Sequence, residues 1–474
     1  MSKTESLDIG IYGLPAPKVA VGQSSRGRMT YAQIVAKDNE PLNPILQPQT
    51  EPFPPQVPIT FDRYLDKRFV DLEVEQIWNK HWQIACREED IPNIGDRVSY
   101  DIVDQSYVIV RSGPEEFKAF YNTCRHRGRR LCDSKGSGTH IRCPFHAWTW
   151  NLDGSLEWVP SEEDFPHVKK RAYGLEQVQV DRWGGNVFIN PDPKAKPLSE
   201  ALGILPDVFA DCPLDERYTA QRLRKKIRCN WKLAQEAFME AYHTLETHWD
   251  HMPFFGTSYG QYGEYDDGES HLNWLTTASM VPDHWVFDKI SPDDSINHFC
   301  TAFGFPFPEK GTIHNFTDAR KYIAKCRAEM IRLSTGRDFS DKTTAYLIDY
   351  IKAFMFPNHH PWWGEGLPWW YRFTPYEDDP GLCIMEVRIL LPTPLNGPTP
   401  PSAAPLDIDF DERCADFPAL GTAGKLVDQD ISNLVAIQKG LKSAAKKNRY
   451  MTLAQYQESN IQHFHRVYNK LLGL

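Results

Sequence analysis

The pattern of apolar and polar positions changes along the chain, and each change marks a different kind of segment. Residues 1–60 show no sustained periodicity and become rich in Pro and Gln towards their end. Such a composition predicts an extended segment that does not fold alone. Further on, the spacing of Val74, Ile77, Trp78 and Trp82 predicts a helix over residues 71–82.

Short apolar runs then replace the helical pattern. Residues 107–111 and 117–121 flank a Ser-Gly-Pro turn, which predicts a β-hairpin, and residues 178–190 supply further strands. A Pro- and Lys-rich stretch at residues 191–197 marks the expected boundary between two domains. Residues 61–195 should therefore form an all-β domain with a leading helix.

Residues 196–474 mix both spacings. Helical patterns cover residues 317–334 and 343–356, whereas residues 369–374 and 382–391 have the pattern of strands. We therefore expect a larger α+β domain, in which helices flank an antiparallel sheet. The fold class predicted for the whole chain is α+β.

Composition narrows the class of protein. The chain has 474 residues, with 53 basic and 63 acidic side chains and a net charge of −10, which argues against nucleic-acid binding. Its first residues lack the apolar core of a signal peptide, and no run of eighteen apolar residues occurs, so we expect a cytoplasmic protein outside the membrane. In that setting the ten cysteines are better explained as metal ligands and buried thiols than as disulfides.

Two closely spaced Cys-His pairs are the strongest chemical signal. Cys124 and His126 form one pair, and Cys143 and His146 form the second. Such a set suits either a zinc site or a Rieske [2Fe–2S] centre, in which two His replace two Cys on one iron. Zinc fingers usually pair Cys with Cys and His with His. Here each pair holds one of each, which favours the iron–sulfur cluster.

The sequence around these pairs reads Asn-Thr-Cys-Arg-His-Arg-Gly at residues 122–128 and His-Ala-Trp-Thr-Trp-Asn-Leu-Asp-Gly at residues 146–154. Both stretches resemble the Rieske domain of the aromatic-ring-hydroxylating oxygenases. The resemblance to the catalytic (alpha) subunit of that family extends from about residue 61 to residue 474. Ala147 stands where the family usually has Gly, and we expect it to need slightly more room near the second loop.

A second set of chemical groups lies in the larger domain. Asn230 opens a predicted helix that carries Glu236 and Glu240 one turn apart, followed by His243 and His248. Five residues turn an ideal helix by about 500°, which leaves two side chains about 140° apart. His243 and His248 can therefore share a metal only if the helix ends or bulges between them. Taken alone, these residues would be better explained as two buried histidines and a solvated acidic face than as a metal site.

A triad of two His and one carboxylate is typical of non-haem Fe(II) oxygenases. The resemblance assigns the carboxylate to Asp430, with Asp428 as the competing choice. It also implies that Glu240 joins a cluster-ligating His, either His126 or His146, of one subunit to His243 of the next. That bridge would imply a ring-shaped oligomer, most simply a homotrimer, with a small beta subunit left open.

The resemblance also implies a reaction. Electrons from a ferredoxin or an NAD(P)H-dependent reductase would enter at the cluster and pass to a mononuclear Fe(II), which uses O₂ to hydroxylate a small apolar substrate. No Gly-x-Gly-x-x-Gly fingerprint follows a strand, so a separate reductase is expected. Ala237 stands where a common family pattern has Asn, and no hydrogen bond is expected from it.

Basic residues near the cluster pairs could dock a ferredoxin or tune the cluster potential; they are Arg125, Arg127, Arg129 and Arg130. For the basic run at residues 222–228 we favour a solvated strand edge over docking. Clustered aromatics at residues 254–255, 362–363 and 369–371 suit an aromatic or polycyclic substrate, although such clusters are more often core. His359 and His360 suit either the substrate pocket or a surface turn.

Two other classes of function compete with the oxygenase. A Rieske-type electron carrier would explain the first four ligands but leave the long remainder after residue 197 without a role. A zinc-stabilised structural or interaction protein would explain the same four residues and not the triad. The pattern is compatible with the entry of either one or two oxygen atoms into the substrate.

Overall fold

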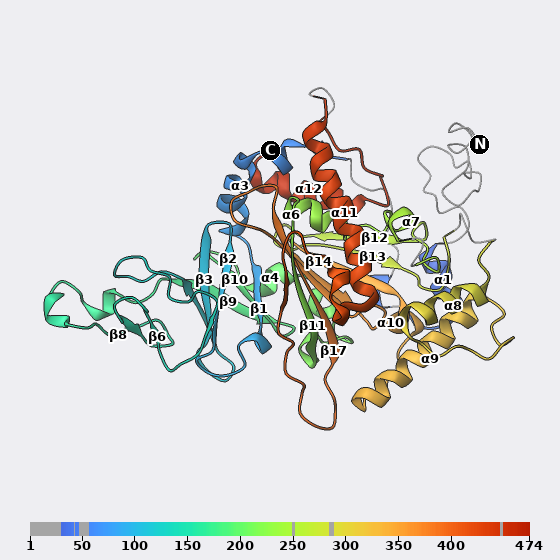
Figure 1. Cartoon of the computed structure of the whole chain (residues 1–474), viewed down its shortest axis with the longest axis horizontal. Coiled ribbons are helices and arrows are strands. Elements are labelled where there is room, and N and C mark those ends of the chain that lie inside the picture. The colour runs from blue at the N-terminus through green and yellow to red at the C-terminus, as the bar shows by residue number, and fades with distance from the viewer. Residues whose placement is uncertain (1–29, 42, 47–55, 249–251, 284–288, 446–448) are drawn as a thin grey trace.

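The computed structural model describes residues 30–41, 43–46, 56–248, 252–283, 289–445 and 449–474. A smaller part built of strands and a larger part built of helices and strands are visible in Figure 1, which confirms the predicted α+β class. Strands β6 and β8 lie at one end of the molecule, and helices α8 and α9 lie at the other. No helix of the described residues is long and apolar enough to cross a membrane.

The smaller part contains a seven-stranded and a three-stranded sheet. In spatial order the first sheet consists of β1 (Gln83–Arg87), β10 (Asn186–Asn190), β9 (Gln177–Trp183), β4 (Phe117–Tyr121), β3 (Gln105–Arg111), β2 (Arg97–Ile102) and β5 (Lys135–Gly136). The second consists of β6 (Ile141–Arg142), β7 (Thr149–Trp150) and β8 (Leu156–Trp158). Strands β3 and β4 pair antiparallel, so the predicted hairpin is present.

The larger part is built on an eight-stranded, mostly antiparallel sheet. Its strands, in spatial order, are β12 (Gln261–Asp266), β13 (His271–Thr277), β14 (Tyr350–Met355), β15 (His359–Trp363), β16 (Trp369–Pro375), β17 (Cys383–Pro392), β11 (Arg217–Ile227) and β18 (Leu406–Ile408). The longer helices are α8 (Pro292–Phe303), α9 (Phe316–Thr335), α11 (Gly421–Ser443) and α12 (Ser459–Leu472).

Short helices complete the fold. The α-helical ones are α1 (Tyr31–Ala36), α2 (Asp62–Leu65), α3 (Lys67–Glu73), α4 (Leu198–Leu202), α5 (Leu205–Val208), α6 (Trp231–Glu236), α7 (Thr244–Thr247) and α10 (Thr344–Ile348). The single turns of other types are η1 (Pro44–Leu46), η2 (Val74–Trp78), η3 (Glu88–Asp90), η4 (Glu162–Asp164), η5 (Lys170–Ala172), η6 (Leu214–Glu216), η7 (Cys414–Asp416) and η8 (Pro418–Leu420).

Several element predictions need correction. The helix expected over residues 71–82 begins earlier, with α3, and ends with η2, so Trp82 lies outside it. Residues 350–355 form strand β14 rather than the second half of a helix. Every residue of β14 is buried, and a strand covered on both faces lacks the alternation that would reveal it.

Part of the N-terminal segment is folded. Within residues 1–60, expected to be extended, α1 is a helix capped by Thr30, and its Tyr31, Ile34 and Val35 are buried in the core of the larger part. The Pro-rich residues 47–55 lie outside the described residues.

The basic run at residues 222–228 does not form a solvated edge. Strand β11 lies between β17 and β18, and its Arg222 and Lys225 are buried. Arg222 donates to Asp90 at 2.9 Å, and Arg388 of β17 donates to the same carboxylate at 2.6 Å. Because Asp90 follows β1, this buried ion pair joins the smaller part of the molecule to the larger sheet.

Candidate iron–sulfur and iron centres

The four residues of the two Cys-His pairs lie on two similar loops. Strand β4 leads directly into the loop of Cys124, and β6 leads into the loop of Cys143. In each loop the Cys carbonyl oxygen accepts a hydrogen bond from the residue four positions on, Gly128 at 2.9 Å and Ala147 at 3.0 Å. Both residues have positive φ, 74° and 60°. Ala147 therefore carries a conformational cost, because an L-residue disfavours this region.

The two loops bring their imidazoles together at the surface. The ring centroids of His126 and His146 lie 4.7 Å apart, and the His126 ring stacks on Trp148 at 5.2 Å. Both thiols are buried. The thiols of Cys124 and Cys143 interact with each other, and the two partly exposed imidazoles form a second neighbouring pair.

The residues fit a [2Fe–2S] cluster. Nδ1 of His126 is buried without a hydrogen-bond partner among the described residues, as a metal-binding nitrogen would be before the metal is added. Burial lowers the pKa of His126, which keeps the imidazole neutral. Burial also raises the pKa of the Cys124 thiol to about 11, so a cationic metal is needed to hold it as a thiolate.

Arginines around these loops are mostly engaged within the chain. Arg125 pairs with Glu176 at 3.2 Å, Arg129 with Asp133 at 2.7 Å, and Arg130 with Asp101 at 2.7 Å. Arg127 lies over the ring of Phe145, which is exposed. The docking and potential-tuning interpretations both stay predictions, with Arg127 and Phe145 the groups best placed to meet a partner.

The second candidate centre is positioned by helix α6. The side chain of Asn230 caps this helix by accepting from the N–H of Lys232, and the backbone N–H of Asn230 donates to Gln438 of α11 at 3.0 Å. The helix ends at Glu236, so Glu240 lies beyond it rather than one helical turn along it. Glu236 is engaged elsewhere, with Tyr64 and His465.

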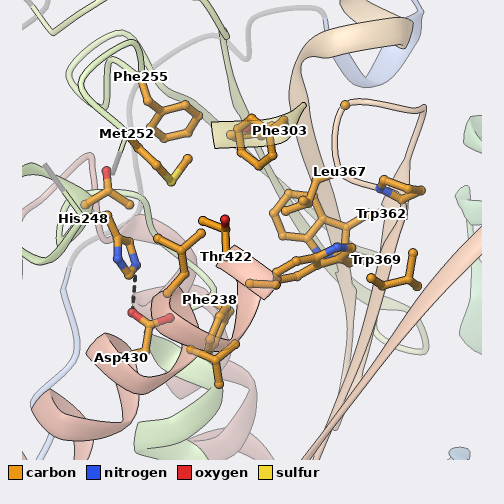
Figure 2. Close-up of a pocket in the computed structure, with 18 of the residues that line it drawn as sticks. Phe238, His248, Met252, Phe255, Phe303, Trp362, Leu367, Trp369, Thr422 and Asp430 are labelled. Carbon is orange, nitrogen blue, oxygen red and sulfur yellow. Dashed lines mark ion pairs between the residues drawn. The ribbon is translucent and has the colours of Figure 1, made fainter. Parts of the chain in front are cut away.

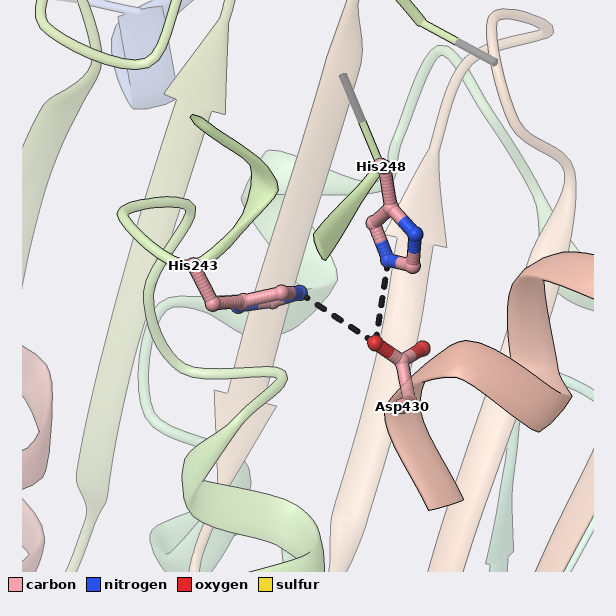
Figure 3. A group of neighbouring side chains, drawn as sticks. All are labelled: His243, His248 and Asp430. Atoms are coloured by element: carbon pink, nitrogen blue, oxygen red, sulfur yellow. Dashed lines mark ion pairs between the residues drawn. The ribbon is translucent and has the colours of Figure 1, made fainter. Parts of the chain in front are cut away.

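His243 and His248 are the N-cap and the C-cap of the one-turn helix α7, which begins after the first and ends before the second. Their Nε2 atoms lie 3.5 Å and 2.9 Å from one carboxylate oxygen of Asp430, which projects from α11. Figure 3 shows both rings directed at that carboxylate. The three candidate ligand atoms lie within 4.8 Å of one another, close enough for one metal ion.

The other ring nitrogen of each His is held by a neighbouring oxygen. His243 Nδ1 lies 2.6 Å from Glu240 Oε1, and His248 Nδ1 lies 2.9 Å from Gln429 Oε1. Donation from Nδ1 leaves the Nε2 lone pair of each imidazole on the side of Asp430, which is the tautomer that a shared metal ion requires. Burial lowers the pKa of His243, but Glu240 and Asp430 outweigh it and raise the pKa to about 9.

Asp428, the competing choice, is used differently. Its carboxylate accepts the backbone N–H groups of Cys414 and Ala415 at 2.8 and 2.9 Å. The structure therefore directs Asp430, not Asp428, at the two His. Gln429 was not anticipated from the sequence, since no spacing rule marks an amide beside a carboxylate as the partner of a distant His.

A cavity of about 590 Å³ opens beside the triad. Figure 2 shows His248 and Asp430 at one side of it and Trp362 and Trp369 at the other. Its other walls are mainly apolar and include Phe238, Met252, Phe255, Phe303 and Leu367.

The clustered aromatics divide between this cavity and the core. Trp362, Trp369 and Tyr371 line the cavity, whereas Trp363 and Trp370 are buried elsewhere. The His359–His360 pair lies in β15 and is fully buried, so the surface-turn alternative is wrong. His360 contacts Lys352 and Gln235 at 3.2 Å each.

Comparison with known families matches both parts. Residues 81–172 match the Rieske [2Fe–2S] domain, and residues 209–474 match the catalytic domain of the ring-hydroxylating alpha subunit. The carnitine monooxygenase oxygenase subunit of Escherichia coli (strain K12) is 31% identical over 188 residues, 39% of this chain and 50% of that protein. The anthranilate 1,2-dioxygenase large subunit of Acinetobacter baylyi is 34% identical over 206 residues, 41% and 43% of the two chains.

Those alignments span about half the length of the curated relatives or less. Solved structures agree in fold over more of the chain. Naphthalene 1,2-dioxygenase with bound indole covers 90% of this chain and 94% of its own, with 16% identity and a TM-score of 0.63. A quaternary ammonium Rieske monooxygenase in complex with L-carnitine covers 87% and 95%, with 17% identity and a TM-score of 0.60.

Proposed function

The chain belongs to the ring-hydroxylating alpha-subunit family of Rieske oxygenases, and from this premise we propose that it is a terminal oxygenase that hydroxylates a small organic substrate. The observation that carries the proposal is the convergence of two imidazoles and one carboxylate at the wall of an apolar cavity. Neither a pure electron carrier nor a zinc-stabilised protein needs this second centre.

In the proposed function Cys124, His126, Cys143 and His146 hold the Rieske cluster, and His243, His248 and Asp430 hold Fe(II). When bound, the cluster supplies single electrons and the iron activates O₂. The chain itself supplies orientation. Glu240 and Gln429 accept hydrogen bonds from Nδ1–H of the two ligand imidazoles, which fixes the rings and keeps each Nε2 on the metal side.

Apolar walls serve the same reaction. The cavity side chains exclude water from the space beside the triad and hold a substrate against it. Aromatic surfaces at Trp362 and Trp369 suit a planar ring. We therefore propose an aromatic or polycyclic skeleton as the substrate body, oxidised either by dihydroxylation or by monooxygenation and dealkylation.

A quaternary ammonium substrate is the second candidate. It is favoured by the names of relatives such as the carnitine monooxygenase subunit and by the aromatic walls, since aromatic faces also bind quaternary ammonium groups. Screening ring compounds and quaternary ammonium compounds by reductase-dependent O₂ uptake separates the two. Mass analysis under ¹⁸O₂ then shows whether one or two labelled atoms enter the product.

The experiment that tests the oxygenase itself is His243→Ala. We expect the variant to keep the visible spectrum of the cluster and to lose product formation, because one of the two imidazoles is gone. A variant that turned over normally would refute the triad. A colourless protein containing zinc would refute the Rieske assignment.

We further propose that electrons arrive from a ferredoxin or an NAD(P)H-dependent reductase. A homotrimer would place His126 or His146 of one subunit near Glu240 of the next, as the resemblance implies. Ultracentrifugation with and without added beta subunit measures that assembly, and a fully active monomer would contradict it.

A further inference from the structure

Arg327 is an unexpected group in the wall of the substrate cavity. It projects from α9, where it is partly buried and lines the same cavity as the triad. Its guanidinium carbon lies 4.7 Å from the ring centroid of Phe305. Its Nε is buried and has no hydrogen-bond partner within the described part of the chain. A permanent cation therefore stands beside largely apolar walls.

Several other buried arginines among the described residues are neutralised by carboxylates. Arg320 pairs with Asp38 at 2.7 Å and with Asp349 at 2.6 Å. Arg217 forms an ion pair with Glu365. Burying a guanidinium without a counterion is costly, which is why such pairing is the usual arrangement. Arg327 has no carboxylate within ion-pair distance among the described residues.

Glu365 does not fill that role for Arg327. Burial lowers the pKa of Arg327, and the Glu365 carboxylate offsets this only in part, because Arg217 engages that carboxylate. Glu240 also lines the cavity, but both of its oxygens face His243. Glu365 and Glu240 are thus engaged by other groups, and the positive charge of Arg327 remains available to a ligand.

Two further polar groups of the cavity lack partners. Thr277 Oγ1 and Trp362 Nε1 are buried without hydrogen bonds to any described residue, and both residues line the cavity. Thr277 is paired across strands β13 and β14 with Tyr350, whose hydroxyl is electrostatically coupled to Arg327. An indole N–H and a hydroxyl are donors, so an oxygen-bearing ligand would satisfy them.

We propose that the substrate carries a carboxylate that pairs with Arg327, while its apolar body lies along Trp362 and Trp369 towards the triad. A single carboxylate matches the single uncompensated charge, and its two oxygens fit the forked donors of a guanidinium. This inference rests on the proposed oxygenase function and names the class of its substrate. A cation that lacks a carboxylate would meet repulsion from Arg327.

Matched ligand pairs test the proposal. Phenylacetate, 3-phenylpropionate, 4-phenylbutyrate, 5-phenylpentanoate and biphenyl-4-carboxylate are each compared with the corresponding carboxamide. Affinity for the holoenzyme is measured by calorimetry and by quenching of tryptophan fluorescence. We expect at least one carboxylate to bind about 10- to 100-fold more tightly than its amide, the range of a charge-assisted bidentate pair.

Arg327→Gln should reduce the preference for the carboxylate over its carboxamide to within about threefold, while the affinity for the carboxamide stays near the wild-type value. Arg327→Lys should retain part of the preference for the carboxylate. The matched control is Arg332→Gln on the same helix, because Arg332 is exposed and pairs with Glu329. This control should keep the full preference for the carboxylate.

The proposal is wrong if no carboxylate binds more tightly than its amide, or if the preference survives in Arg327→Gln. It is also wrong if a phenylalkyl-trimethylammonium ion of matched length binds more tightly than the carboxylates. These affinities are measured independently of the cluster spectrum and of turnover in His243→Ala. If the carboxylate preference is absent, the oxygenase proposal still stands. If the oxygenase proposal fails, the His243→Ala experiment detects that failure separately.

Discussion

Replacing Glu240 by Gln tests how the chain holds its iron. Glu240 is nearly buried, and its two oxygens contact His243 twice, at 2.6 Å from Nδ1 and at 3.0 Å from the backbone N. Glu240→Gln keeps the size of the side chain and removes its charge. The imidazole then loses a short, charge-assisted hydrogen bond that fixes its orientation.

The expected effect can be worked from that contact. A hydrogen bond to a charged group contributes about 1.5–3 kcal/mol, and about 1.4 kcal/mol corresponds to a factor of ten. If the orientation of His243 carries most of this energy, iron affinity should fall about 10- to 100-fold. The loss of an outer partner of a ligand His has the same range in metal sites generally.

The assay is competition for Fe(II) between the reconstituted protein and a colorimetric chelator under anaerobic conditions. Glu246→Gln is the matched control, since Glu246 is exposed on α7 between the two His. Cluster absorbance should be equal in all three proteins. Iron affinity of Glu240→Gln within twofold of the wild type would refute the orienting role.

Two other predictions concern stability and the cluster. Asp90→Asn should lower the free energy of unfolding by about 3 kcal/mol, because it breaks a buried ion pair with Arg388, whereas Asp378→Asn at an exposed pair should leave it nearly unchanged. Burial alone would raise the pKa of Asp90, but its arginines hold it well below the ordinary value. The stabilisation is therefore present above about pH 5 and is lost as the pH falls. The free energy of unfolding, measured by chemical denaturation at several pH values, should fall less steeply on the acid side in Asp90→Asn than in the wild type. Equal slopes would contradict this. Cys143→Ser should abolish the visible absorption of the cluster, while Cys383→Ser, at a buried thiol outside the loops, should retain it.

Features defined by adjacent residues were predictable. The hairpin of β3 and β4 was visible because two apolar runs enclose a Gly-Pro turn, and the loop of Cys124 follows it without a gap. The match to both families confirms the fold class and the two cofactors that were predicted from the sequence. Here the local pattern and the tertiary structure agree.

Features decided by neighbours distant in sequence were not predictable. Strand β14 was mistaken for a helix because it is covered on both faces. The basic strand β11 looked solvated, yet Asp90 and Glu386 neutralise its Arg222 from two different elements. Arg327 lies inside a helix that was predicted well, and only the surrounding chain shows that its charge faces a cavity.

The break between Glu236 and His243 links the iron centre to the proposed assembly. Since α6 ends at Glu236, the chain turns back and lets Glu240 accept both the backbone N–H and Nδ1–H of His243. Each carboxylate oxygen has two lone pairs, so one acceptor site on each remains. Glu240 can therefore orient His243 alone and still accept the ring N–H of a second imidazole from a neighbouring subunit.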